Sequence, residues 1–402
     1  RENALAWKIS QSRFCEKLFI APGNAGTSFL GQNVEISVLD FTAIRDLILS
    51  KKISIVIIGP EAPLVNGLHD FLINQIKKEN FIVIGPKKNG ATLEGSKEFA
   101  KEFMFRHKIP TARYRIFNKK NIHEATAFLN TLKPPYVLKA DGLAAGKGVL
   151  ILTDLNEAKK SLENMILKKK FGKASERVVI EEYLKGIEVS SFVLTDGNSY
   201  KIFPMAKDYK RIGVGDTGLN TGGMGAISPV PFVDQKLYHK IENQIIRPTI
   251  NGLKKDKIDY IGFLFIGLMI VRKEPYVIEY NVRLGDPETE AILPRIESDL
   301  LEIFLQLKSS HLETTNLKVN DLFSSTVMTV SKGYPEKYEK GKIISGLDCK
   351  NDSFLFHSGT KKEGQNIVTS GGRVIAVTSM DKLLDKALEK SYKTISKIEF
   401  EG

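Results

Sequence analysis

The sequence is poor in the residues that build disulfide frameworks and soft metal sites. Among its 402 residues there are only two cysteines, Cys15 and Cys349, and they show no CxxC spacing. The six histidines include no HxxxH pair. We therefore expect neither a disulfide framework nor a metal held by thiolates or histidines.

Long apolar runs are also missing. No stretch approaches the roughly 20 apolar residues that a membrane-spanning helix requires, and the sequence does not open with a signal-peptide pattern. With 42% hydrophobic and 26% charged residues, the composition is that of a globular protein. We expect a cytoplasmic protein without a membrane partner, with enough core for about two to four domains.

Acidic residues are outnumbered by basic ones, 47 against 59, so the net charge is +12. Such a surplus attracts nucleic acid or small anionic substrates. The basic residues are scattered, apart from short runs such as 168–170, and no aromatic residues accompany them as a stripe. We interpret them as a solvated surface and expect no nucleic-acid partner; a basic nucleic-acid binder is the less favoured alternative.

Apolar strands and helical patterns alternate over residues 1–92. The runs 18–21, 53–58 and 81–84 each end in a turn of glycine and proline. Repetition of strand, turn and helix predicts a parallel doubly wound α/β sheet. Ligands of such sheets gather at the carboxyl ends of the strands, where these turns lie.

The most informative segment is 136–152, a glycine-rich loop between two apolar runs that indicate β-strands. Glycines let backbone N–H groups turn toward an anion, and lysines add positive charge. The spacing is one residue short of a Walker A motif, and the chain continues as a strand. We interpret the segment as a hairpin flap over a nucleotide; a plain glycine-rich hairpin is the alternative. The residues concerned are Lys139, Gly142, Gly146, Lys147 and Gly148.

A helix is expected over 96–107, with Ser96 as its N-cap. Lys97 then lies in the first turn, where the helix dipole disfavours a cation. A bound anion would remove this penalty, whereas a solvated lysine is the alternative interpretation.

The remainder of the chain divides into further segments. The loop 213–225 indicates a mobile substrate clamp, with Asp216 in it. We also expect an α/β lobe at 112–183, a helix near 234–255, a β-hairpin of 262–271 and 276–283, a linker at 309–316 and an α+β unit at 324–400.

Polar side chains interrupt an apolar strand at 279–283. Glu279 and Asn281 are two residues apart and point to one face, and both offer the oxygen ligands that Mg²⁺ prefers. Arg283 follows on the same face. After it, Asp286 or Glu288 has the chemistry to orient an amine, or alternatively to cap a helix that begins at Pro287.

These motifs resemble phosphoribosylamine–glycine ligases (glycinamide ribonucleotide synthetases), which are ATP-grasp enzymes of purine biosynthesis. The resemblance extends along the whole chain. It is carried by the segments 21–27, 59–65, 93–97, 139–148, 220–226, 283–290 and 357–361.

The resemblance implies a role for each matching residue. The implied ATP-binding residues are Lys97, Lys139, Gly142, Gly146, Lys147, Gly148, Glu181, Tyr183, Leu184 and Glu188. Glu279 and Asn281 match the ligands of Mg²⁺ or Mn²⁺, and Arg283 and Asp286 would act at the reacting groups. The implied substrate-binding residues are Gly23, Asn24, Glu61, Asp216, Lys361 and Arg373; of these, Lys361 and Arg373 would take the 5′-phosphate.

The implied fold is α/β, with three parts. A doubly wound N-terminal domain (1–92) precedes an ATP-grasp fold of two α+β lobes (93–315) and a small C-terminal α+β domain (316–402). The implied reaction joins glycine to 5-phosphoribosylamine through a glycyl phosphate, with ATP as cosubstrate, in a monomer. It depends on positioning and charge neutralisation, and it needs no nucleophilic side chain.

The chain departs from the family pattern in two respects. The strand and two glycines that precede Arg-Glu in the family are missing before Arg1, as is a short tail after Gly402, so we expect a trimmed sequence or a fragment. Residues 262–271 also offer no second metal carboxylate. The alternatives are an ATP-grasp carboxylase acting on bicarbonate and a nucleotide-binding module without catalysis.

Overall fold

The computed structural model describes all residues except 144–147, 310–311 and 349–351. Gly146, Lys147 and Cys349 therefore lie outside the described residues. Within the described part of the chain, no helix is long and apolar enough to cross a membrane.

The N-terminal part alternates strands with helices, as expected. Two parallel strand pairs, β1 with β2 and β3 with β4, lie among five helices. The elements are α1 (Glu2–Ser10), β1 (Phe19–Ile20), β2 (Gln32–Asn33), α2 (Phe41–Ser50), β3 (Ile55–Ile57), α3 (Glu61–Val65), α4 (Leu68–Gln75), β4 (Ile82–Ile84) and α5 (Lys88–Gly95).

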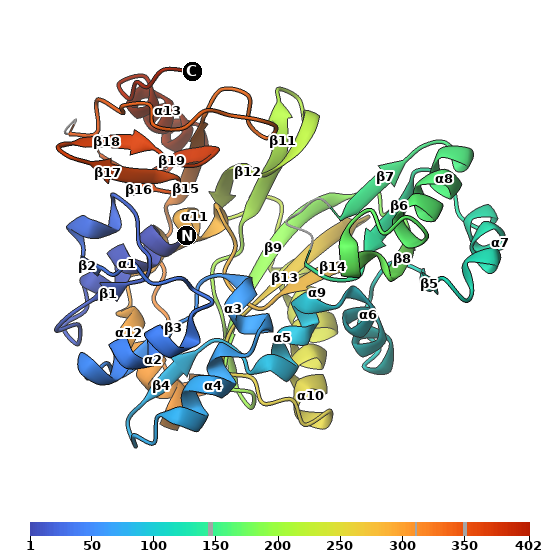
Figure 1. Ribbon diagram of the computed structural model, residues 1–402, viewed down its shortest axis with the longest axis horizontal. Coiled ribbons are helices and arrows are strands. Elements are labelled where there is room, and N and C mark those ends of the chain that lie inside the picture. The colour runs from blue at the N-terminus through green and yellow to red at the C-terminus, as the bar shows by residue number, and fades with distance from the viewer. Residues whose placement is uncertain (144–147, 310–311, 349–351) are drawn as a thin grey trace.

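The helix predicted at 96–107 is α6 (Lys97–Arg106), and the Ser96 hydroxyl accepts a hydrogen bond from the Phe99 amide (3.1 Å), which confirms the N-cap. An antiparallel sheet of order β5-β8-β6-β7 follows. Helices α7 and α8 pack on its apolar face, and this lobe stands apart on one side of the molecule (Figure 1). Its elements are β5 (Tyr114–Asn118), α7 (Ala125–Asn130), β6 (Tyr136–Ala140), β7 (Val149–Leu152), α8 (Leu155–Ile166) and β8 (Arg177–Glu182).

A second antiparallel sheet has the order β10-β9-β13-β14. The expected hairpin is confirmed as β13 and β14, although β14 ends at Asn281 and leaves Arg283 beyond the strand. A helical run whose middle is a π-helix covers the sheet, at the position predicted for 234–255. The elements are β9 (Ile187–Thr195), β10 (Tyr200–Ile202), α9 (Gln235–Ile241), the π-helix (Glu242–Ile246), α10 (Arg247–Lys255), β13 (Gly262–Val271) and β14 (Glu274–Asn281).

The third large sheet has the order β11-β12-β15-β19-β16, and α13 packs on it. Its elements and neighbours are β11 (Lys207–Gly213), β12 (Thr217–Ser228), α11 (Glu288–Ile292), α12 (Leu300–Ser309), β15 (Phe323–Val330), β16 (Ser353–His357), β17 (Thr360–Glu363), β18 (Asn366–Thr369), β19 (Arg373–Asp381) and α13 (Leu384–Ile395).

One expectation about this region is wrong. Residues 213–225 do not form a loop, because most of them belong to β12, which pairs with β11 and β15. The glycines and threonines of 217–223 suggested a flexible segment, but this part of β12 pairs with β11, and β12 continues from Gly225 as a partner of β15. The hairpin thereby joins the C-terminal sheet, although its residues precede position 316.

Candidate active site

Side chains from all three parts of the chain line a cavity of about 510 Å³. The lobe contributes Lys139 and Gly142, β14 contributes Glu279 and Asn281, and β19 contributes Arg373. A larger groove of about 940 Å³ over the C-terminal sheet is lined mainly by apolar residues and has no lysine or arginine. The charged cavity is therefore the candidate for anionic substrates.

The lysines at one end of the cavity form a cation-rich pocket. Lys97 Nζ donates to the carbonyl oxygen of Gly142 (3.2 Å), at the start of the flap. Burial lowers the pKa of Lys97, while the nearby Glu279 opposes this. Lys97 is thus directed into the cavity and not solvated, and the anion-binding interpretation is the one that the geometry supports.

Lys101 belongs to this pocket as well, and the sequence analysis missed it. Its Nζ lies 3.2 Å from Glu181 Oε1, and Lys139 Nζ lies 3.0 Å from Glu181 Oε2. All three side chains are buried. Two lysines share one carboxylate, so this triad carries a net charge of +1 that suits a phosphate. The sequence does contain an indication of this role, because Lys101 is four residues after Lys97 and therefore lies on the same face of the helix.

Glu279 and Asn281 both line the cavity, which confirms that they share a face. Burial raises the pKa of Glu279, but Lys210, Lys139 and Lys97 outweigh it, so the pKa is lowered and the carboxylate is ionised. Oxygen donors of this kind fit Mg²⁺, with phosphates and water as further ligands. Within the described ranges, no group of three or more His, Cys, Asp or Glu side chains gathers as a metal site.

Arg283 connects the cavity wall to the N-terminal part of the chain. Its guanidinium lies 3.1 Å from Glu61 Oε2 and 2.9 Å from Glu94 Oε1. Glu94 also accepts a hydrogen bond from the Val282 amide (2.8 Å). Burial raises the pKa of Glu94. Glu94 was not predicted as a site residue, although it belongs to the matching segment 93–97.

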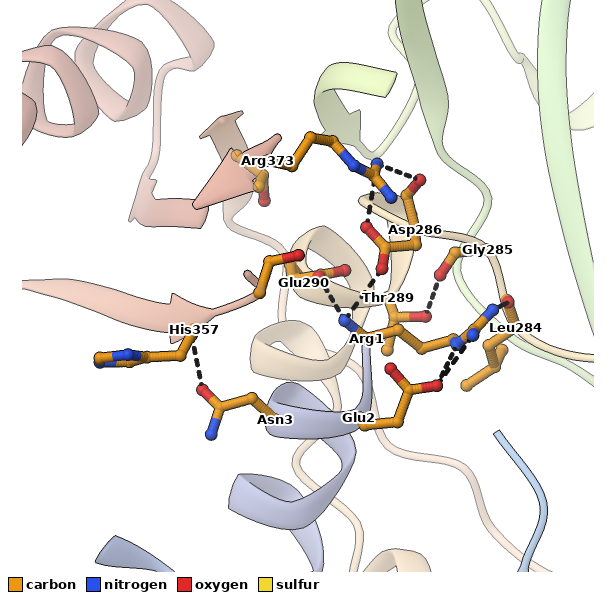
Figure 2. A network of polar contacts seen from close by, with 12 residues as sticks. Arg1, Glu2, Asn3, Leu284, Gly285, Asp286, Thr289, Glu290, His357 and Arg373 are labelled. Carbon is orange, nitrogen blue, oxygen red and sulfur yellow. Dashed lines mark hydrogen bonds and ion pairs between the residues drawn. The ribbon is translucent and has the colours of Figure 1, made fainter. Parts of the chain in front are cut away.

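Asp286 lies at the centre of the network in Figure 2. Arg373 lies 3.1 Å from its Oδ1 and also donates to its backbone oxygen (2.9 Å). The backbone nitrogen of Arg1 lies 3.3 Å from Asp286 Oδ2 and 2.6 Å from Glu290 Oε1. Burial raises the pKa of Asp286, but the positive charges of Arg1 and Arg373 hold it well below its usual range. Helix α11 begins after Pro287 with no side-chain cap, so the capping alternative is wrong.

Several predicted residues do not line this cavity. Gly23 and Asn24 lie near the C-terminal part, where Asn24 Nδ2 donates to the backbone oxygen of His357 (2.8 Å). Asp216 is exposed at the tip of the β11–β12 hairpin, and Lys361 is exposed and paired with Glu363. Tyr183, Leu184 and Glu188 follow β8 outside the lining residues, and Glu188 Oε2 lies 2.6 Å from Lys210 Nζ.

Three family models match the chain. They are described as the N domain (residues 1–94), the ATP-grasp (A) domain (95–289) and the C domain (324–402) of phosphoribosylglycinamide synthetase. A phosphoribosylamine–glycine ligase of Chlorobaculum tepidum is 43% identical over 409 residues, covering 100% of this chain and 95% of the relative. The ligase of Haemophilus influenzae is 42% identical, with 100% and 94% covered.

Solved structures agree with the sequence comparison. The phosphoribosylamine–glycine ligase of Thermotoga maritima has a TM-score of 0.86 at 33% identity, covering 100% of this chain and 95% of that one. Biotin carboxylase of Campylobacter jejuni has a TM-score of 0.75 at 15% identity, covering 100% and 90%. At that identity the second likeness shows the fold alone. The predicted α/β fold class, with an ATP-grasp fold at its centre, is confirmed.

Proposed function

Because the chain belongs to the phosphoribosylglycinamide synthetase family, we propose that it joins glycine to 5-phosphoribosylamine. The reaction consumes ATP and yields glycinamide ribonucleotide, ADP and phosphate. The observation that carries the proposal is the single cavity in which Lys97, Lys139 and the Glu279–Asn281 pair meet. Cations for phosphates and oxygen donors for Mg²⁺ or Mn²⁺ are what phosphoryl transfer requires.

The reaction has two steps. A carboxylate oxygen of glycine attacks the γ-phosphorus of ATP, and ADP leaves. The amine of phosphoribosylamine then attacks the carbonyl carbon of glycyl phosphate, phosphate leaves, and the nitrogen loses a proton. Bound Mg²⁺ would neutralise phosphate charge, while Lys97 and Lys139 bind phosphate oxygens and Arg283 orients the carboxylate.

The remaining residue roles are part of the proposal. Gly142 and Gly148 would approach the phosphates, the segment from Glu181 to Leu184 the adenine, and Glu188 the ribose. Asp286 and Glu61 would hold the ribose and amine of the second substrate, with Arg373 at its phosphate. Gly23, Asn24, Asp216 and Lys361 depend on the resemblance alone. We also propose the domain division 1–92, 93–315 and 316–402, a monomer and a cytoplasmic location.

The test is ADP release from Mg·ATP with phosphoribosylamine generated in situ, with and without glycine. Glycine-dependent release supports the ligase. Release that depends on bicarbonate instead of glycine would favour the carboxylase alternative, and ATP binding without any release would favour a nucleotide-binding module.

A further inference from the structure

The peptide group of Gly222 lies where the pairing of two strands is interrupted. A register shift in the described pairing of β11 with β12 leaves residues 221–224 opposite Lys210 alone. Backbone groups in such a bulge need partners from outside the ladder. The amide of Gly222 donates to the hydroxyl of Tyr334 (2.9 Å), and its carbonyl oxygen accepts from Arg373 Nη1 (2.6 Å). One peptide group therefore connects the tyrosine to the arginine.

Tyr334 is held against the turn that leads into Arg373. The backbone amide of Ser331 donates to the carbonyl oxygen of Gly372 (2.7 Å), and its hydroxyl donates to that of Gly371 (2.9 Å). The amide of Tyr334 in turn donates to the carbonyl oxygen of Ser331 (3.1 Å). A Cβ at Gly372 would lie 2.2 Å from Tyr334 Cδ2, so the ring packs directly on this glycine. The tyrosine hydroxyl therefore has a fixed place relative to the start of β19.

Arg373 has its second anchor on Asp286. Its Nη1 lies 3.1 Å from Asp286 Oδ1 and 2.9 Å from the backbone oxygen of the same residue (Figure 2). An arginine side chain has many rotamers, and two anchors from different segments select one direction for its guanidinium group. Gly222 and Arg373 are among the residues that line the charged cavity, whereas Tyr334 is not. Tyr334 therefore reaches the cavity only through the Gly222 peptide and Arg373.

We propose that Tyr334 is a positioning residue, which directs Arg373 toward the phosphate of phosphoribosylamine through the Gly222 peptide. The inference rests on the proposed function, which places Arg373 at that phosphate. A hydroxyl that accepts from the amide of a peptide group also strengthens the carbonyl of that group as an acceptor. Gly222 is exposed, so water replaces the hydroxyl when it is removed, and the hydrogen bond contributes little to stability.

The experiment uses Tyr334→Phe, which removes the hydroxyl and keeps the ring on Gly372. Loss of one neutral hydrogen bond raises the KM for phosphoribosylamine by about 3- to 10-fold. The KM values for ATP and glycine, kcat at saturation and the thermal unfolding temperature change little. Tyr338→Phe is the matched control: its ring centroid lies 6.1 Å from that of Tyr334, and its hydroxyl has no hydrogen bond among the described residues. Its kinetic constants match those of the wild-type protein.

A double-mutant cycle tests whether Tyr334 acts through Arg373. Arg373→Lys keeps a positive charge beside Asp286 but loses the planar guanidinium that two anchors can orient. In that background Tyr334→Phe causes no further rise in the KM for phosphoribosylamine, because the residue that it positions is gone. Additive effects of the two substitutions would overturn the inference.

A binding measurement on Tyr334→Phe alone completes the test. Titration calorimetry uses ribose 5-phosphate, which carries the sugar phosphate without the amine, and Mg·ADP as the second ligand. Ribose 5-phosphate binds about 3- to 10-fold more weakly than to the wild-type protein, while the affinity for Mg·ADP is unchanged. Equal affinities for ribose 5-phosphate overturn the inference.

Two further outcomes are distinguishable from these. A rise in the KM values of all three substrates together with a lower unfolding temperature makes the role of Tyr334 structural and also overturns the inference. If the wild-type protein releases no ADP in response to glycine, it is the proposed function that fails.

Discussion

At the scale of single residues, buried charge decides what the cavity can bind. Lys101 belongs to none of the sequence motifs and is buried. It forms an ion pair with Glu181, which also pairs with Lys139. Burial lowers the pKa of Lys101 to about 8, against the attraction of Glu181. The single negative charge of Glu181 faces the positive charges of both Lys101 and Lys139. A bound phosphate would neutralise the remaining positive charge.

We predict that Lys101→Met raises the KM for ATP by about tenfold, because one cation of the phosphate pocket is lost. The free energy of unfolding changes little, since Glu181 keeps Lys139 as its partner. Steady-state kinetics and thermal unfolding check both points. Lys87→Met, at a partly exposed lysine paired with Asp259, serves as the control, and equal KM values for ATP in the two variants would contradict the assignment.

A second prediction concerns Glu279. Glu279→Gln removes the charge that would hold Mg²⁺ and lowers turnover by at least about 100- to 1,000-fold. The fold is retained, because Glu279 has no ion-pair partner in the described structure whose loss would expose an unpaired group. Activity is measured across Mg²⁺ concentrations beside circular dichroism, and unchanged activity would refute the metal assignment.

At the scale of elements, hydrogen bonds connect the start of the flap to α6, the helix that carries Lys97. Asp141, just after β6, accepts hydrogen bonds from the Ser96 hydroxyl (3.0 Å) and from the Glu98 amide (3.1 Å). The carboxylate thereby accepts a hydrogen bond from a free N–H group at the start of α6, and its negative charge interacts favourably with the helix dipole. It also fixes Lys97 relative to Gly142, which the sequence pattern could not indicate.

We predict that Asp141→Ala lowers the free energy of unfolding by about 1 kcal/mol and raises the KM for ATP several-fold. Asp154→Ala is the matched control, since Asp154 caps α8 in the same lobe by accepting from the Glu157 amide (2.7 Å). It should cost similar stability and leave the KM for ATP unchanged. Equal KM values for ATP in the two variants would show that the hydrogen bonds of Asp141 have no role in ATP binding.

The β11–β12 hairpin allows another test. Gly223 has φ +113°, and a Cβ there would collide with Pro287 and lie 2.9 Å from Asp208 Oδ1. Gly215 has φ +70° but open space around it. We predict that Gly223→Ala costs about 1–3 kcal/mol more than Gly215→Ala, as measured by urea unfolding, and that only Gly223→Ala lowers activity.

At the scale of the whole molecule, the N-terminal and C-terminal parts pack against each other through His357. Asn3 Oδ1 accepts a hydrogen bond from the backbone amide of His357 (2.8 Å), and Asn24 donates to its backbone oxygen (2.8 Å). The ring bonds to Thr360 (2.9 Å), and a Cβ at Gly26 would lie 2.5 Å from it. The two parts therefore meet at a residue whose imidazole is buried and bonded to Thr360.

Burial lowers the pKa of His357 from 6.5 to about 4. The unfolded chain then binds the proton more readily than the folded one, so this stability is complete above pH 6.5 and is lost as the pH falls toward 4. We predict a loss of about 2 kcal/mol between pH 7 and pH 5 from this residue. Urea unfolding at both pH values checks it, and His357→Gln should show a correspondingly smaller decrease; an equal decrease would exclude the histidine.

Local residue patterns by themselves determined much about this protein. Three features depend only on residues that are close together in the chain: the glycine flap, the N-cap at Ser96, and the alternation that places Glu279 and Asn281 on one face. These features indicate phosphate and metal binding directly. The family follows from the same motifs. For those reasons the fold class and the elements around the phosphates were predictable.

Only the tertiary structure decided which distant residues meet. The sharing of Glu181 by two lysines and the entry of the β11–β12 hairpin into the C-terminal sheet both depend on contacts between residues that lie far apart in the chain. The sequence does not show whether a basic residue neutralises a given carboxylate. Its partner is set by packing, and so the pairing of charges in the cavity could not be predicted from the sequence.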